Sequence, residues 1–217
     1  IGKLCKFLGV PVVTLITHGH HINSPFWNLR KRGVRPTETT LTQLFTAKEL
    51  AGTDALEISR HIREAFVYDD FAWQKERGIC ISDPKRAEGL HKVLYKCPHC
   101  LTENQMSSGG AKLRCSACSK TWTLGIYGEL SADCGETEFS HIPDWYEWER
   151  QQVRDEILSG TYRFDGPVTV DSLPNAKRFF RLGEGYIRHD MEGFYVCGKT
   201  GSGEPFEMVK TVPSLYS

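Results

Sequence analysis

The 217-residue chain is long enough for one or two hydrophobic cores, and its composition, 40% hydrophobic and 25% charged, is that of an ordinary globular protein. Its 27 Lys and Arg residues balance its 27 Asp and Glu residues, so the formal net charge at pH 7 is zero. A dedicated nucleic-acid binder carries a basic excess that neutralises phosphates, and the lack of that excess argues against this class.

The N-terminal residues predict a helix that leads into a strand. Residues 8–17, LGVPVVTLIT, form an apolar run without polar alternation, typical of a strand covered on both faces in the parallel sheet of an α/β domain. Residues 18–90 offer few neighbours for it, namely a strand over residues 39–46 and a shorter one over residues 79–82. We therefore expect further strands before residue 1. The run is shorter than the ~20 residues of a transmembrane helix, and no signal-peptide pattern is present.

Three helices are predicted between this strand and the first cysteine pair. Residues 55–66 follow Asp54, and Asp54 and Glu57 have the spacing of a capping box. Residues 68–77 (YDDFAWQKER) and residues 84–96 (PKRAEGLHKVLYK), the latter with a proline at its start, are the other two. The segment is therefore expected to be mainly helical.

Four of the eight cysteines follow the pattern C-x2-C-x14-C-x2-C: Cys97, Cys100, Cys115 and Cys118. Two such pairs bring four thiolates into a tetrahedron around one Zn²⁺, and Ser-Ser-Gly-Gly at residues 107–110 supplies a turn between them. All four positions would then be thiolate, so no site is open for water and the zinc would be structural. Residues 95–122 contain little apolar mass, so metal would supply much of the folding free energy. The alternatives are two disulfides or unrelated thiols, which a reducing compartment disfavours.

The C-terminal third predicts an amphipathic helix and then a sheet. Residues 143–158 carry an apolar stripe on a charged helix: Trp145, Trp148, Val153, Ile157 and Leu158. Four strand-like segments follow, separated by glycine-containing turns, at residues 176–182, 185–190, 193–199 and 205–212. These segments predict an antiparallel meander.

Three other groups of residues could carry chemistry. His18, His20 and His21 follow the first strand, where open α/β sheets place their sites, but no acidic residue lies nearby in sequence, so polar loop residues are the favoured interpretation. A basic cluster could hold a phosphate or rest on an anionic membrane surface, or could be a solvated loop: Arg30, Lys31, Arg32 and Arg35. The scattered cysteines, Cys5, Cys80, Cys134 and Cys197, lack any catalytic signature and are expected to pack as small apolar residues.

Several segments together resemble one enzyme family. The stretch GVPVVTL at residues 9–15 resembles the last conserved block of the glycerolipid acyltransferases of the 1-acyl-sn-glycerol-3-phosphate type. With YDDFAWQKE, HKVLYKCPHC and EFSHIPDWYEWERQQVRDEI, it is similar to a bacterial subgroup that carries an inserted zinc ribbon. The resemblance implies transfer of an acyl group from acyl-CoA or acyl carrier protein to a lysophospholipid such as lysophosphatidic acid. It also implies a cytoplasmic protein that is peripheral at the inner face of the membrane.

The chain departs from that family in its catalytic parts. The family uses a His-x4-Asp pair, in which histidine is the general base on the acceptor hydroxyl, and none of the eight histidines has an aspartate five residues later. The phosphate-handling block of the family is missing too, and Thr14 replaces a proline. Both missing parts precede the VPVV strand in the family, so we expect them upstream of residue 1 and expect this segment alone to be inactive.

These observations predict three parts. Residues 1–94 would be the C-terminal part of an acyltransferase α/β domain, residues 95–140 a zinc ribbon, and residues 141–217 a helix followed by a β-rich module. A non-enzymatic zinc-ribbon interaction module is the alternative. A zinc-ribbon nucleic-acid binder is disfavoured by the zero net charge.

Overall fold

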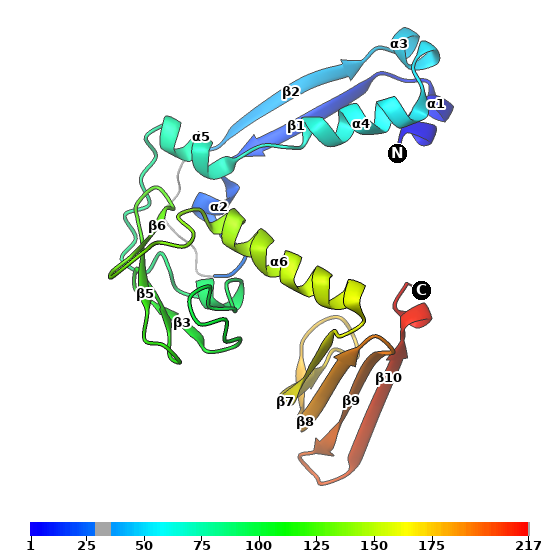
Figure 1. The fold of residues 1–217 in the computed structure, drawn as a ribbon. Helices are drawn as coiled ribbons and strands as arrows, with labels where there is room; N and C mark the ends of the chain where they lie inside the picture. The colour runs from blue at the N-terminus through cyan, green and yellow to red at the C-terminus, as the bar shows by residue number, and fades with distance from the viewer. Residues whose placement is uncertain (29–35, 217) are drawn as a thin grey trace. The chain divides into compact units, whose positions relative to one another are not determined.

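The chain forms two compact units in the computed structural model, which describes residues 1–28 and 36–216 (Figure 1). Unit 1 is Ile1–Tyr146 and unit 2 is Glu147–Ser217. The architecture is mixed α/β, as predicted, but every strand pair in the described residues is antiparallel. Helix α6, Ile142–Ser159, contributes residues to both units. The finer division into three parts stays a prediction.

The first part of unit 1 is a two-stranded sheet with helices. Its elements are α1 (Gly2–Leu8), β1 (Val12–His18), α2 (His20–Asn23), β2 (Glu38–Phe45), α3 (Ala47–Gly52), α4 (Ala55–Ala65) and α5 (Asp70–Glu76). One face of the sheet packs on α3 and α4 around the cluster Phe45, Leu50, Ile58 and Ile62. The helices of this cluster cover one face, and apolar side chains on the other face are exposed in the described part of the chain. Val13, Leu15 and Leu41 are 53%, 60% and 66% exposed there. Coverage of this strand on both faces is therefore not found within the described residues.

The helix predictions for this part are correct for two helices and wrong for the third. Asp54 and Asp69 cap α4 and α5 through hydrogen bonds from backbone N–H groups. A reciprocal capping box exists, but at Thr46 and Glu49, whose hydrogen bonds lower the pKa of the Glu49 carboxyl. Residues 84–96 hold turns, the short 3₁₀ helix η1 (Leu90–Lys92) and, at Lys96, an isolated β-bridge to Glu103.

The cause of that break is Gly89. Its φ of +85° is a left-handed conformation, and a Cβ there would lie 2.2 Å from the Trp27 carbonyl oxygen. The backbone at Gly89 therefore packs against the backbone of Trp27, and a helix through residues 84–96 is interrupted there. The strand expected over residues 79–82 is also absent, although Ile81 N–H donates to the Ile126 carbonyl at 2.7 Å.

The second part of unit 1 is a four-stranded antiparallel sheet in the order β3-β4-β5-β6. Its strands are β3 (Met106–Gly109), β4 (Lys112–Cys115), β5 (Thr121–Leu124) and β6 (Leu130–Ala132). Leu113 and Trp122 are fully buried, and the Trp122 ring meets the Trp145 ring edge to face at 5.0 Å. Residues 95–122 were expected to have too little apolar mass for a core. Trp145, Leu124 and Leu130, from outside that segment, complete one.

Unit 2 contains the predicted meander, in the order β10-β9-β8-β7. Its elements after α6 are β7 (Arg163–Ser172), β8 (Phe180–Asp190), β9 (Gly193–Thr200), β10 (Pro205–Thr211) and the 3₁₀ helix η2 (Val212–Tyr216). Strand β7 was not predicted, because Gly166 and Pro167 interrupt its pattern. Proline is tolerated there because β7 is an edge strand.

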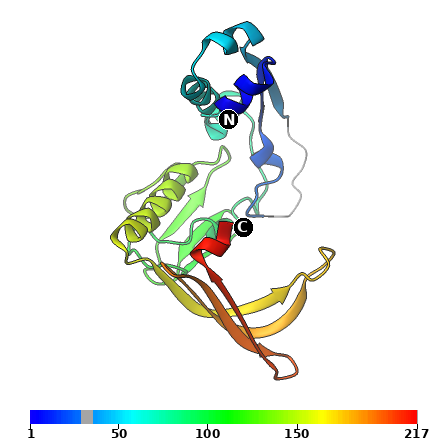
Figure 2. The same ribbon diagram turned by 90° about the vertical axis from the view of Figure 1, so that its right-hand side faces the viewer.

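The break predicted at residues 183–185 is wrong, because β8 runs through Gly183 and Gly185. These glycines permit a close approach of β9 instead of a turn. A Cβ on Gly183 would lie 2.0 Å from the Lys199 carbonyl oxygen, and one on Gly185 would lie 2.5 Å from that of Cys197. Figure 2 shows the resulting sheet as strongly curved.

Candidate metal centre

Two turns of the same backbone geometry present the four predicted cysteines. Cys97 and Cys100 lie in a turn before β3, whereas Cys115 ends β4 and Cys118 lies in the turn before β5. The residue after the second cysteine of each pair, Leu101 or Ser119, has a positive φ, 62° or 64°. In the first turn the Cys97 carbonyl accepts from Leu101 N–H at 2.9 Å. The backbone therefore folds each pair so that its two sulfurs face the other pair.

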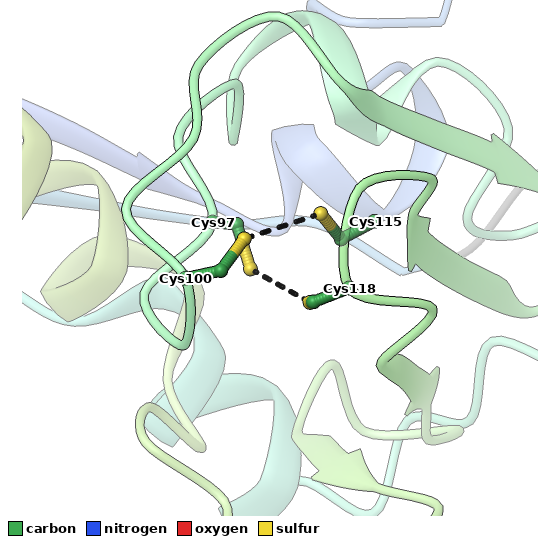
Figure 3. A group of neighbouring side chains, drawn as sticks. All are labelled: Cys97, Cys100, Cys115 and Cys118. Atoms are coloured by element: carbon green, nitrogen blue, oxygen red, sulfur yellow. Dashed lines mark hydrogen bonds between the residues drawn. The ribbon is translucent and has the colours of Figure 1, made fainter.

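The four sulfur atoms form a compact cluster (Figure 3). Cys97 Sγ lies 3.7 Å from Cys118 Sγ, Cys100 Sγ lies 3.7 Å from Cys115 Sγ, and all four atoms are within 4.8 Å of one another. A disulfide needs a separation of about 2.05 Å, so these contacts are not disulfides, and all eight cysteines are free. The cluster can hold a metal ion.

The thiols of Cys97, Cys100 and Cys118 differ in how readily they ionise. Burial is the main cause that raises the pKa of Cys97, and it also raises that of Cys118. Cys100 is different, because hydrogen bonds with the Thr102 hydroxyl and backbone N–H lower its pKa to about 6. An ion bound by all four thiolates must therefore displace protons from sulfur, which makes metal binding weaken as the pH falls.

A carboxylate links the two cysteine turns from outside the cluster. Glu138 forms an ion pair with Lys120, accepts from Trp122 Nε1 at 3.2 Å and lies 3.3 Å from His99 Nδ1. Burial is the largest single effect on Glu138 and would raise its pKa, but the hydrogen bonds from Lys120, the backbone and Trp122, together with the charge of Lys120, outweigh burial and the pKa is lowered. His99 lies inside the first cysteine pair and Lys120 just after the second, so Glu138 bridges them. No sequence pattern pointed to this residue.

The other predicted residues lie elsewhere. Cys134 is outside the cluster and exposed, so the expectation that it packs as an apolar residue is wrong, whereas Cys5 packs against the Phe45 core as expected. His18 and His21 are brought to Asp70, an acidic partner that sequence proximity could not reveal because it is about 50 residues away. The basic cluster lies outside the described residues: Arg30, Lys31, Arg32 and Arg35.

Comparisons of the chain with protein families, with curated proteins and with solved structures find no match. Within residues 1–28 and 36–216, none of the helices has the length and apolar character needed to cross a bilayer.

Proposed function

We propose that Cys97, Cys100, Cys115 and Cys118 bind one structural Zn²⁺. The observation that carries this proposal is the spacing of the sulfur atoms. Four thiolates at the usual Zn–S distance of about 2.3 Å in a tetrahedron are separated by about 3.8 Å, and the Cys97–Cys118 and Cys100–Cys115 sulfur pairs are both 3.7 Å apart. With four thiolate ligands, no position is open for a water nucleophile, so the ion would hold the ribbon together and take no part in catalysis.

Metal analysis tests this proposal directly. Protein purified without chelator should contain one zinc per chain by mass spectrometry, and cobalt exchange should give the absorption bands of tetrahedral thiolate coordination. Cys115→Ser should lose the metal, whereas Cys134→Ser, which changes an exposed cysteine outside the cluster, should keep it. Zinc-free protein, or equal metal content in the two variants, would contradict the proposal.

We further propose that the chain belongs to a phospholipid-biosynthesis acyltransferase that acts on lysophosphatidic acid or a related lysophospholipid at the inner membrane face. The resemblance of residues 8–160 carries this proposal. A physical feature supports it: Val13, the last residue of the VPVV motif, and Leu15 expose an apolar strand face that an enclosing α/β domain would bury. The catalytic His-x4-Asp pair would come from a segment preceding residue 1, because no such pair exists in the 217 residues.

The test is transfer of a labelled acyl group, from acyl-CoA or acyl carrier protein, to lysophosphatidic acid. A parent chain that includes a His-x4-Asp pair should be active, and the 217-residue chain alone should be inactive. Turnover by the 217 residues alone would refute the assignment of catalysis to another segment. An inactive parent with every lysophospholipid acceptor would favour the alternative, a non-enzymatic zinc-ribbon interaction module.

A further inference from the structure

A second polar cluster lies in unit 1, where α5 begins beside the end of β1 (Figure 1). The Asp70 carboxylate is its centre. Its Oδ1 lies 2.8 Å from His18 Nδ1, and its Oδ2 lies 3.1 Å from His21 Nδ1 and accepts from Gly19 N–H at 3.2 Å. Three donors thus satisfy this carboxylate.

The His21 ring lies between Asp70 and Gln74. Gln74 Nε2 donates to the carbonyls of Ile79 and Ile126, which directs Gln74 Oε1 at His21 Nε2, 3.1 Å away. Both ring nitrogens of His21 therefore face oxygen acceptors, and both contacts are hydrogen bonds when the ring carries two protons.

The neighbouring carboxylate, Asp69, is less satisfied. Its Oδ1 accepts from the N–H groups of Phe71 and Ala72 as the cap of α5, and its Oδ2 lies 3.3 Å from His141 Nε2. Its side chain is 45% exposed. Asp69 is thus a carboxylate that is fixed in position by the helix cap and still accessible to a ligand.

Aromatic side chains surround these two carboxylates in a cavity of about 460 Å³. The cavity is lined by His21, Phe26, Trp27, Phe66, Tyr68, Asp69, Asp70, Phe71, His141 and Pro143. Phe26 and Phe66 are more than half exposed and Tyr68 is about half exposed, so three aromatic rings face solvent around one site. No lysine or arginine is among its lining residues in the described part of the chain.

These features together select the charge of a ligand. The faces of aromatic rings carry partial negative charge and attract cations, most strongly when a carboxylate adds its own field. An anion would meet carboxylates and ring faces with no lysine or arginine among the described lining residues, and a neutral apolar group would not use Asp69. We propose that this cavity binds an alkylated ammonium group, of which trimethylammonium is the simplest form. The proposal does not depend on the acyltransferase assignment.

Choline and its carbon isostere test the charge requirement. 3,3-Dimethylbutan-1-ol has the shape of choline without the positive nitrogen, so both compounds are titrated into the full chain and amide NMR shifts of residues 66–71 and 141 are followed. Choline should bind at least about tenfold more tightly than the alcohol, a difference of about 1.4 kcal/mol. Equal binding of the two, or shifts from neither, would overturn the proposal.

Matched variants locate the site. Asp69→Asn keeps a side-chain acceptor for the α5 cap but removes the charge, so choline binding should fall about tenfold and alcohol binding should not change. Asp54→Asn makes the same change at the cap of α4, away from the cavity, and should have no effect. Tyr68→Leu, at a half-exposed position, should also weaken choline binding. Loss of binding in Asp54→Asn, or full binding in both cavity variants, would overturn the assignment.

The same group could come from a free amine or from a lipid headgroup. Vesicles of phosphatidylcholine and of phosphatidylglycerol separate these sources in a flotation assay. Flotation with phosphatidylcholine that free choline competes away assigns the headgroup, whereas binding of choline without flotation assigns the free amine.

Discussion

Replacing Glu138 by glutamine should weaken both the fold and the metal centre. Glutamine keeps an oxygen for the Trp122 indole, but it removes the negative charge opposite Lys120. Removal of one partner from a fully buried pair costs about 3–5 kcal/mol, whereas an exposed pair contributes about 0–1 kcal/mol. The side chains of Lys120 and Glu138 are 10% and 18% exposed, between these limits. We therefore expect a loss of about 2 kcal/mol in the free energy of unfolding.

The same substitution should act on the metal, because Glu138 connects His99 and Lys120, which lie in the two cysteine turns. Partners in the outer shell of a metal site typically contribute 10–100-fold to affinity, and we expect about a tenfold loss here. Urea unfolding followed by tryptophan fluorescence measures the first effect, and competition with a chromophoric chelator measures the second.

Glu136→Gln is the matched control for Glu138→Gln. Glu136 is exposed, and the contact it makes with Lys120 uses its backbone carbonyl, at 2.7 Å, which the substitution leaves intact. This variant should match the wild type in both assays. If Glu138→Gln behaves like Glu136→Gln, the Glu138 bridge contributes neither to the free energy of unfolding nor to metal affinity, and the reasoning is wrong.

Two further predictions concern unit 2. Gly185→Ala should destabilise the meander by roughly 1–3 kcal/mol, because the new methyl group would lie 2.5 Å from the Cys197 carbonyl oxygen, whereas Gly201→Ala, with nothing within 4 Å, should be neutral in the same thermal unfolding assay. The pKa of Asp165 is lowered from its usual value of 3.8, chiefly by a hydrogen bond from Tyr186 and next by one from Arg163. Tyr186→Phe removes the first of these and should raise this pKa. A lowered carboxyl pKa stabilises the fold above the unfolded-state pKa, and that stability is lost as the pH falls through the folded-state pKa. The variant should therefore be less stable than the wild type near neutral pH, and it should lose less stability than the wild type on acidification. Carbon-13 NMR titration of Asp165 measures the shift, and an unchanged pKa would contradict the role of Tyr186.

The cysteine cluster could be predicted from sequence because its determinants are local. Two residues between cysteines set each pair, and a short hairpin brings Cys115 back to Cys100. The positive φ angles of Leu101 and Ser119 could not be predicted in the same way, because neither residue type favours that conformation. In both turns, the spacing of the cysteines predicts the cluster better than the types of the residues between and after them.

The failures share a different cause, which is contact between distant segments. From sequence, Gly89 is compatible with a helix, but in the structure it packs against Trp27. The glycines of β8 likewise predict a turn from sequence, but in the structure they lie inside a strand against β9. His18 and His21 likewise lacked an acidic partner until folding brought Asp70 to them. Each of these residues has a local pattern that fits two structures, and a long-range contact selects between them. Local pattern is therefore sufficient for the cysteine cluster and insufficient for the aromatic cavity, whose lining residues span from His21 to Pro143.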